Sequence, residues 1–469
     1  MFKKFIFVFI ANLFIFSALV SFAVEKNHVI KSSEKLIAEV KFSPLFFLAS
    51  PDSKHIAYVG EKAGKRFVIV DGNKGKDYDN IVIALIFSPD SKRVAYGVQK
   101  DNKNFVVLND IEGKSYDSIG STVIFSPDSQ RLFYSARTDD KGFVILDGIE
   151  GKKYDGIGKS LVFSPDSKHI AYGVKSGNDY FVVLDGAEGK RYDSIGSGIF
   201  FSPDSKHLAY WAQSGNKRFL VVDGQEGKHY DAIGNTIVFS PDSKRVAFVA
   251  QKGNKYFLVV DGQEGKHYDA IGNTIVFSPD SKRIIYAAQL GNKRFAVIDG
   301  REEEYRDGIG ATIVFSPNSR RFAYVAQKDN KYSVVIDGQE GKQFDAIGNG
   351  SIIFSPDSNH VVYCAQTDNK RFVVINGKEE KKYDDVGNKS LVFSPDSKYL
   401  AYMAQSDNKH FVVFGAEKQN FYDNILNLTM GGIVFDSSDR FHYLAIRDKS
   451  VYLVEGRVEG ELSETVGKR

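Results

Sequence analysis

Cysteine is almost absent from this sequence, because Cys364 is the only one among 469 residues. A single cysteine excludes an intramolecular disulfide, and no cysteine follows the N-terminal apolar segment to carry a lipid. A chain that folds in an oxidising compartment without disulfides has to be held together by packing. With 42% hydrophobic and 13% aromatic residues, the chain has ample material for packed cores and is not disordered.

The residue patterns that build catalytic centres are also missing. The nine histidines show no metal-ligand spacing within one repeat, and most stand where other copies have Arg, Tyr or Gln. A Gly-x-Ser-x-Gly nucleophile elbow is absent, as is an α/β region to carry one. A chain of near-copies presents one group many times, whereas catalysis needs unlike groups at one point. The sequence therefore predicts no cofactor, no metal and no enzyme activity.

Charge of one sign does not gather anywhere along the chain. There are 62 Lys plus Arg against 59 Asp plus Glu, and both signs are interspersed in every copy of the repeat. Nucleic acids and anionic membranes need a basic patch or stripe. Neither is predicted as a partner.

Long apolar runs are confined to the start of the chain. Lys3 and Lys4 precede an apolar run over residues 5–20, and small residues follow at 21–23. This pattern predicts a signal peptide over residues 1–23 and a periplasmic or secreted protein, with an uncleaved membrane anchor as the alternative. No later run approaches the length of a membrane span, so none is expected after signal peptide removal.

Proline is scarce but regularly placed. Of 11 prolines, ten stand in a Ser-Pro-Asp-Ser turn, with Asn for Asp in one copy, and a degraded copy follows at residues 435–440. The step is 38 residues seven times and then 39 twice. These prolines are Pro51, Pro89, Pro127, Pro165, Pro203, Pro241, Pro279, Pro317, Pro356 and Pro395. Such a fixed period indicates a repeat architecture.

One repeat, residues 236–273, contains four short runs of β-branched and aromatic residues separated by turn residues. We expect strands over 237–239, 245–251, 256–260 and 266–271. No window long enough for a helix is free of Gly, Pro or Asp-Gly. Four antiparallel strands in a short repeat are typical of a β-propeller blade, so residues 24–469 are predicted as an all-β propeller region, with units from about 35 to 457.

The turn and the strand after it also carry a resemblance. Residues 163–172, Phe-Ser-Pro-Asp-Ser-Lys-His-Ile-Ala-Tyr, resemble the WD40-like repeat of TolB-type propellers and of some prolyl-oligopeptidase-type enzymes. The resemblance covers nearly all the chain after the signal peptide and implies a propeller with a role in the cell envelope. The chain differs in having Ser where that family usually has Gly, and it lacks the Trp-Asp dipeptide of eukaryotic repeats.

The repeats number about eleven, and the last is incomplete. Residues 35–42 alternate apolar and polar, and we expect them to supply the missing fourth strand of the last blade, which leaves no free sheet edge. Propellers usually have four to eight blades per ring. We therefore favour two consecutive rings over one large ring, although no linker marks the boundary.

A position that recurs from copy to copy of the repeat is called a column here. Two columns are structural in our interpretation. A Tyr-Asp pair recurs, and we expect the Tyr to pack between blades and the Asp to accept backbone N–H groups. An Asp-Gly pair recurs without calcium-loop spacing and predicts a hairpin turn. Its aspartates are Asp71, Asp147, Asp185, Asp223, Asp261, Asp299 and Asp337.

A third column supplies the predicted binding residues. Long polar side chains end each second strand, on the rim of the disc that also carries the connections between blades. They are Gln99, Arg137, Lys175, Gln213, Gln251, Gln289, Gln327, Gln366 and Gln405. Ordinary solvated residues are the alternative interpretation.

A fourth column varies from copy to copy and includes Trp211, the only tryptophan. We add Trp211 to the candidate binding residues, as an anchor for a peptide or sugar, with gap filling as the alternative. Its members are Val59, Gly97, Ser135, Gly173, Trp211, Val249, Ala287, Val325, Cys364 and Met403. Together the columns favour an exported, non-catalytic scaffold for a protein or peptide partner in the envelope. A carbohydrate-binding propeller, or a propeller hydrolase or lyase, is the alternative.

Overall fold

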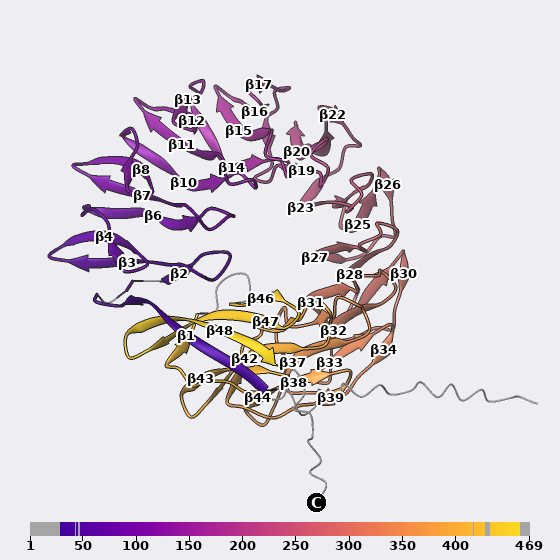
Figure 1. Cartoon of the computed structure of the whole chain (residues 1–469). Helices are drawn as coiled ribbons and strands as arrows, with labels where there is room; N and C mark the ends of the chain where they lie inside the picture. The colour runs from indigo at the N-terminus through magenta and orange to yellow at the C-terminus, as the bar shows by residue number, and fades with distance from the viewer. Residues whose placement is uncertain (1–28, 43, 46, 416, 427–431, 460–469) are drawn as a thin grey trace, which may run out of the picture.

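The computed structural model describes residues 29–42, 44–45, 47–415, 417–426 and 432–459. Eleven antiparallel sheets stand radially around one central opening (Figure 1). The predicted signal peptide, residues 1–23, lies outside the described residues. Among the residues described, no helix has the length and apolar character needed to cross a bilayer.

Each sheet is a blade of four strand positions, and the blades are numbered 1 to 11 from residue 47 onward. The first strand lies nearest the opening and the fourth lies at the periphery (Figure 1). In blades 1 to 4 and 6 to 8 the first strands are β2 (Phe47–Ala49), β6 (Asn80–Phe87), β10 (Ser118–Phe125), β14 (Gly156–Phe163), β23 (Ala232–Phe239), β27 (Ala270–Phe277) and β31 (Gly308–Phe315). In blades 5, 9, 10 and 11 the first strand is divided into β18 (Ser194–Ile195) and β19 (Phe200–Phe201), β35 (Ala346–Ile347) and β36 (Ile353–Phe354), β40 (Asp385–Val386) and β41 (Val392–Phe393), β45 (Asn424–Ile425) and β46 (Ile433–Ser437).

The second and third strands form the regular centre of each blade. The second strands are β3 (Ile56–Lys62), β7 (Val94–Lys100), β11 (Leu132–Thr138), β15 (Ile170–Ser176), β20 (Leu208–Ser214), β24 (Val246–Lys252), β28 (Ile284–Leu290), β32 (Phe322–Lys328), β37 (Val361–Thr367), β42 (Leu400–Ser406) and β47 (Arg440–Arg447). The third strands are β4 (Lys65–Val70), β8 (Lys103–Leu108), β12 (Lys141–Leu146), β16 (Asp179–Leu184), β21 (Lys217–Val222), β25 (Lys255–Val260), β29 (Lys293–Ile298), β33 (Lys331–Ile336), β38 (Lys370–Ile375), β43 (Lys409–Phe414) and β48 (Ser450–Glu459).

The fourth strands are short in blades 1 to 10 and long in blade 11. They are β5 (Asn73–Lys74), β9 (Ile111–Glu112), β13 (Ile149–Glu150), β17 (Ala187–Glu188), β22 (Gln225–Glu226), β26 (Gln263–Glu264), β30 (Arg301–Glu302), β34 (Gln339–Glu340), β39 (Lys378–Glu379), β44 (Glu417–Lys418) and, for blade 11, β1 (Val29–Glu39). The four-stranded antiparallel blade predicted from the repeat is confirmed.

The strand predictions differ from the structure mainly at the fourth position. Within its own blade, the predicted strand over 266–271 pairs only through Tyr268, which bridges Tyr256. Residues 270 and 271 instead begin β27 of the next blade, where Ala270 pairs with Gln289. The chain has to cross from the periphery of one blade to the inner end of the next, so these residues change sheets.

Packing between neighbouring blades holds the ring together. Each of eleven buried apolar clusters combines residues of two successive blades, and together they cover every junction, including the one between blades 11 and 1. For example, Tyr268 of blade 6 packs with Ile275 and Tyr286 of blade 7. Since no junction is left out, the chain forms one ring, and the preference for two consecutive rings was wrong.

The inner strand of a blade is irregular and the outer strand is short. In blade 6 the register of the first strand shifts between Ile233 and Ile237. The fourth strand, β26, has only two residues. The late irregularities near Gly350 and Asn388 lie in inner-strand connections and mark no ring boundary.

The N-terminal strand closes the ring. β1 pairs with β48 antiparallel, from Val29 with Glu459 to Glu39 with Ser450. The prediction that residues before the first blade supply the fourth strand of the last blade is confirmed, although the strand covers 29–39 and not 35–42. A second contact closes the same junction, because the His442 ring lies 2.7 Å from Asp436 Oδ2 through Nδ1 and 2.6 Å from the main-chain oxygen of Asp52 through Nε2.

The Ser-Pro-Asp-Ser turn joins neighbouring blades. Ser281 has a φ of 64°, in the left-handed region that favours Gly. Its hydroxyl accepts a hydrogen bond of 2.9 Å from the backbone N–H of Asp242 in the preceding blade. The Asp242 carboxylate in turn accepts from Ser240 Oγ at 2.6 Å. Serine therefore provides a contact between blades that glycine lacks.

This contact gives a stability prediction. Ser281→Ala keeps the Cβ and its backbone strain but removes the acceptor, and we expect it to cost about 1 kcal/mol. Ser281→Gly loses the same bond but relieves the strain, so its cost should be smaller. Urea unfolding of the two variants measures the difference. Equal stability of the alanine variant and the unchanged protein would contradict the proposed contact.

Candidate binding site between blades 4 and 5

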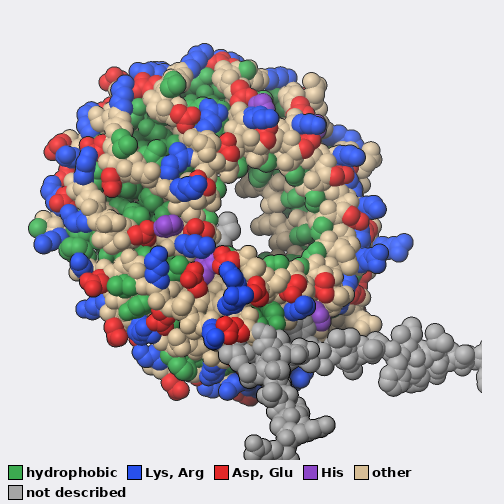
Figure 2. Space-filling model, viewed as in Figure 1, with side chains coloured by type: hydrophobic (Ala, Val, Ile, Leu, Met, Phe, Trp, Pro, Cys, Tyr) green, Lys and Arg blue, Asp and Glu red, His purple; other side chains and the backbone are tan. Residues whose placement is uncertain are grey.

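The two rims of the disc have different chemistry. One rim, called the turn face here, carries the Ser-Pro-Asp-Ser and Asp-Gly turns. The other, called the Gln face, carries the hairpins after the second strands and the connections between blades. In the space-filling view, Lys and Arg alternate with Asp and Glu around the opening (Figure 2). The mixed charges seen there match the interspersed charges of the sequence.

The predicted binding column lies on the Gln face, one residue per blade of blades 2 to 10. Several of these side chains bond within their own hairpins. Nε2 of Gln213, Gln251 and Gln289 donates to the main-chain oxygen two residues later, at 3.0, 3.0 and 2.8 Å. Arg137 donates in the same way to the Asp140 main-chain oxygen at 2.8 Å. The ring spaces the column around its circumference and does not bring it together at one point.

Trp211 lies half-buried between blades 5 and 6, among the residues packed against their shared cluster. The Arg218 guanidinium lies over its ring at 4.9 Å from the centroid. A Cβ on Gly196 would lie 2.6 Å from the indole nitrogen, so main chain packs against the ring as well. The ring is thus largely engaged by the protein itself.

The Tyr-Asp column joins blades on the Gln face, as predicted. Asp269 accepts a hydrogen bond from Lys255 Nζ at 2.6 Å and from the Gly291 N–H of the next blade at 2.7 Å. These two bonds hold the pKa of Asp269 below its usual range, and the bond from the Gly291 N–H has the larger effect. The role of this Asp is structural.

The Asp-Gly pairs on the turn face are hairpin turns, as predicted. Asp261 and Gly262 have φ of 52° and 75°, and Asp261 Oδ1 accepts from the Val246 N–H at 2.9 Å. Among the residues that the structure covers, no group of His, Cys, Asp and Glu has the arrangement of a metal site.

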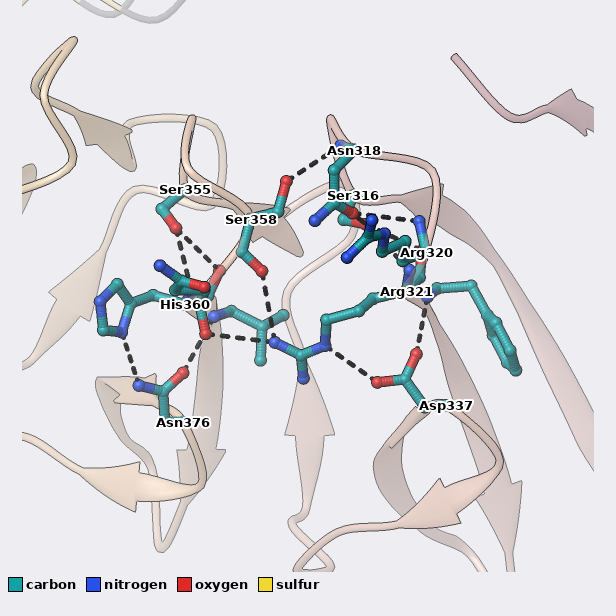
Figure 3. Close-up of polar contacts among 12 residues, drawn as sticks. Ser316, Asn318, Arg320, Arg321, Asp337, Ser355, Ser358, His360 and Asn376 are labelled. Carbon is teal, nitrogen blue, oxygen red and sulfur yellow. Dashed lines mark hydrogen bonds and ion pairs between the residues drawn. The ribbon is translucent and has the colours of Figure 1, made fainter. Parts of the chain in front are cut away.

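The residue before the second strand lies beside the space between blades on the turn face. In blades 2, 3, 6, 7 and 8 it is Arg, whose guanidinium lies over the Phe of the next blade. Arg321, for example, bonds Asp337 at 2.9 Å and reaches the Asn359 main-chain oxygen of blade 9 at 3.2 Å (Figure 3). Its guanidinium lies 5.3 Å from the centroid of the Phe354 ring. The arginine side chain thus covers the junction.

Blades 1, 4, 5 and 9 have His at this position, and cavities lie at the junctions that follow blades 1 and 4. The His169 ring bonds Asp185 at 2.6 Å and extends no further toward Phe201 of blade 5. A cavity of about 660 Å³ lies between blades 4 and 5. Its apolar lining is Val182, Leu184, Phe201, Leu208 and Tyr210. A cavity of about 490 Å³ lies between His55 and Phe87 at the equivalent junction of blades 1 and 2.

The rim of the larger cavity is acidic. Asp166, Asp204, Asp223 and Glu188 line it together with Lys206, His169 and His207. Glu188 pairs with Lys152 and Arg191, and Asp223 lies 2.7 Å from His207. A bond from Ser202 lowers the pKa of Asp204, and a bond from Lys152 lowers the pKa of Glu188, so both are ionised at neutral pH. An acidic rim around an apolar floor favours an apolar group flanked by positive charge.

Two exposed apolar side chains stand at the outer edge of the turn face on other blades. Ile111 of blade 2 is 73% exposed and Ile149 of blade 3 is 75% exposed. Blades 6, 7 and 8 have Gln263, Arg301 and Gln339 at this position. Our sequence reasoning missed this site; His before the second strand is shared by blades 1, 4, 5 and 9 and does not by itself mark it.

No family model matches the chain, and no curated protein sequence is significantly similar to it. Solved propeller structures resemble it distantly. The crystal structure of a eukaryotic initiation factor is 15% identical, with a TM-score of 0.40, over 67% of this chain and 97% of the other. The Dos1 propeller is 13% identical, with a TM-score of 0.31, over 63% and 91%.

The β-propeller domain of the Trilobed protease from Pyrococcus furiosus is 14% identical, with a TM-score of 0.28, over 56% of this chain and 98% of the other. Similarities at these identities concern the fold alone, and at these TM-scores they carry no argument about function. The resemblance to TolB-type repeats stays a prediction at the family level.

Proposed function

We propose that this protein is an exported, non-catalytic scaffold that holds a protein or peptide segment on its turn face. The observation that supports this most is the cavity between blades 4 and 5, which has an apolar floor, an acidic rim and a volume of about 660 Å³. Such a cavity has room for a large apolar side chain of a partner, the usual anchor of an interface, together with residues next to it.

Two further observations support the same face. Ile111 and Ile149 expose apolar side chains on the same face, which a protein partner would cover. Gln213, Gln251 and Gln289 on the opposite face bond their own hairpins and have less to offer a partner. We therefore move the proposed contact surface from the Gln face to the turn face.

The cellular setting of this proposal rests on the N-terminal segment and on the TolB-type resemblance. A cleaved segment of residues 1–23 would deliver the ring to the periplasm or outside the cell, where the partner would be an envelope protein or an exposed peptide. The acidic rim favours a segment with Lys or Arg next to the apolar anchor.

Carbohydrate binding is the second candidate, and it depends on Trp211. Sugar binding by an aromatic ring requires a free ring face, whereas Arg218 covers one face of Trp211 and Gly196 packs against its edge. A glycan array with the mature chain tests this alternative. Retention of a glycan that Trp211→Ala abolishes would favour it.

The scaffold proposal is tested by closing the cavity with a residue that the fold already uses. His169→Arg should place a guanidinium over Phe201, as Arg321 does over Phe354. We expect peptides selected on the mature chain from a displayed random library to carry an apolar residue beside a basic one. Their affinity, measured by fluorescence anisotropy, should fall at least about tenfold in His169→Arg, since about 1.4 kcal/mol of anchor burial is lost.

Arg245→His is the matched control, because it makes the reverse exchange at the junction of blades 6 and 7. It should leave the affinity of the selected peptides unchanged. Failure to select any peptide, or equal binding to the unchanged protein and His169→Arg, would count against the proposed site.

A further inference from the structure

A second cavity lies between the same two blades, on the Gln face and beside the central opening. It has a volume of about 380 Å³ and is lined by the inner strands β14 and β18, by the end of β15 and by Tyr180. Figure 1 shows β14 at the inner edge of its blade. This cavity is separate from the one on the turn face, and the two share no lining residue.

The variable column of the second strand sets the size of this space. Gly173 occupies that position in blade 4, and the nearest atom to a Cβ built there is Ile195 Cδ1 of blade 5, at 2.9 Å. Gly158, which faces Gly173, also contributes no side chain. The equivalent cavity between blades 6 and 7, where Val249 occupies the column, has a volume of only about 260 Å³.

Glycine in the column is not sufficient to open the space. Blade 2 has Gly97 at the same position, but a Cβ there would lie 2.7 Å from Ile83 Cγ1, because the inner strand of blade 2 has a larger side chain facing it. In blade 4 both facing positions are glycine, Gly158 and Gly173, and Ile195 of blade 5 bounds the space beside them.

The lining of this cavity combines an apolar floor with two cations. Ile157, Ile195 and Ile199 form the floor, and Lys159 and Lys175 stand at the rim. Both lysines are exposed, and neither has an ion pair with a carboxylate among the described residues. No Asp or Glu is among the lining residues.

Both lysines are departures from the repeat. Lys159 replaces the Asn235 and Asn273 of blades 6 and 7, and Lys175 replaces the Gln of most blades. The smaller cavity between blades 6 and 7 has Gln251 and Asn273 at its rim and no charged residue. Lys159 and Lys175 thus coincide with the facing glycines, and Lys175 Nζ lies 5.6 Å from the centroid of the Tyr180 ring.

The geometry points to a binding site for a small molecule that has an apolar body and a terminal carboxylate. The isoleucine floor takes the apolar body, and Lys159 and Lys175 bind the carboxylate from the rim. A volume of about 380 Å³ lies at the small end of ligand cavities, which suits a medium-chain or single-ring carboxylate. This site is independent of the partner proposed for the turn face.

Decanoate is the probe, and isothermal titration calorimetry with the chain lacking residues 1–23 measures its binding. We expect one site per chain. Gly173→Val, which introduces the residue found in blades 6 and 8, should weaken binding at least about tenfold by filling the cavity. The double variant Lys159→Asn, Lys175→Gln, which restores the residues of blade 6, should weaken binding by about tenfold while leaving the cavity open.

Two controls separate specific binding from a general apolar effect. Decanol should bind at least about tenfold more weakly than decanoate, because it lacks the charge. Lys252→Gln removes a lysine from the same face outside the cavity and should leave binding unchanged. The proposal is overturned if decanoate does not bind, if decanol binds equally well, or if Gly173→Val binds decanoate as tightly as the unchanged protein. Unaltered thermal melting of both test variants would show that a loss of binding is not a loss of fold.

Discussion

Removal of residues 29–39 will open the ring and destabilise it more than any single substitution. β1 pairs with β48 along its whole length and brings Ala38 into the cluster that joins blades 11 and 1. Ile30 and Ile37 pack against neighbouring clusters. Loss of this strand should cost on the order of 5 kcal/mol and lower the melting temperature by at least about 10 °C.

The truncated chain should also associate with itself, because the absence of β1 leaves an unpaired edge along β48. Light scattering after size exclusion detects this association, and calorimetry gives the melting temperature. Lys35→Ala is the control within the same strand, since its side chain is exposed and it should change neither quantity. A truncated chain that stays monomeric and melts like the full one would show that closure does not depend on β1.

Glu34 is the residue of β1 that we expect to contribute most to the closure of the ring. Its carboxylate accepts hydrogen bonds from Arg447 Nη1 at 3.2 Å and from Tyr422 Oη at 2.7 Å. The bond from Arg447 holds the pKa of Glu34 below its ordinary value of 4.5. A lowered folded pKa means that this contribution is present above pH 4.5 and is lost as the pH falls further. Closure is therefore expected to weaken in acid.

Tyr268→Ala will cause the largest loss of stability of any substitution considered. The Tyr268 side chain is completely buried, with 0% exposure, and lies between blades 6 and 7. Its ring centroid is 6.4 Å from that of Tyr286 in the next blade. Removing a buried ring of this size should cost about 3 to 5 kcal/mol, because the cavity cannot close without moving a whole blade. Denaturant unfolding monitored by circular dichroism measures the loss.

Tyr268→Phe is the matched control, because Phe344 already occupies this position in blade 8. We expect it to cost less than about 1 kcal/mol, since the ring is kept and only the hydroxyl is lost. A large loss of stability in the phenylalanine variant would mean that the hydroxyl, and not ring packing, supplies most of the stabilisation. A small loss in the alanine variant would mean that the blades are held together mainly by their hydrogen-bonded turns.

The repeat made the blade predictable. Period, turn residues and strand patterns together indicated four antiparallel strands, and they placed β24 and β25 within about one residue of their observed ends. The fourth strand was less accurate, because Ala270 belongs by sequence spacing to one repeat and by hydrogen bonding to the next sheet. Local patterns carry no information on which sheet a segment joins.

The candidate sites were harder to predict for the same reason. The Gln column was visible as a pattern, but only the structure shows that Gln251 bonds the main chain of its own hairpin. The His and Arg exchange at His169 was also visible, but its consequence depends on Phe201 of another blade. A cavity between blades is defined by residues about one repeat apart, whose distance the sequence does not state.

By itself, the sequence determined the unit: an all-β module of about 38 residues with two faces that need neighbours and turns that use Ser, Pro, Asp and Gly. It also indicated that residues before the first module complete the last one. Only the tertiary structure decided that eleven modules close into one ring, and which junctions stay open. The physical reason is that ring size and cavity size depend on small differences in width and side-chain volume between neighbouring sheets, and these differences appear only when the sheets are packed together.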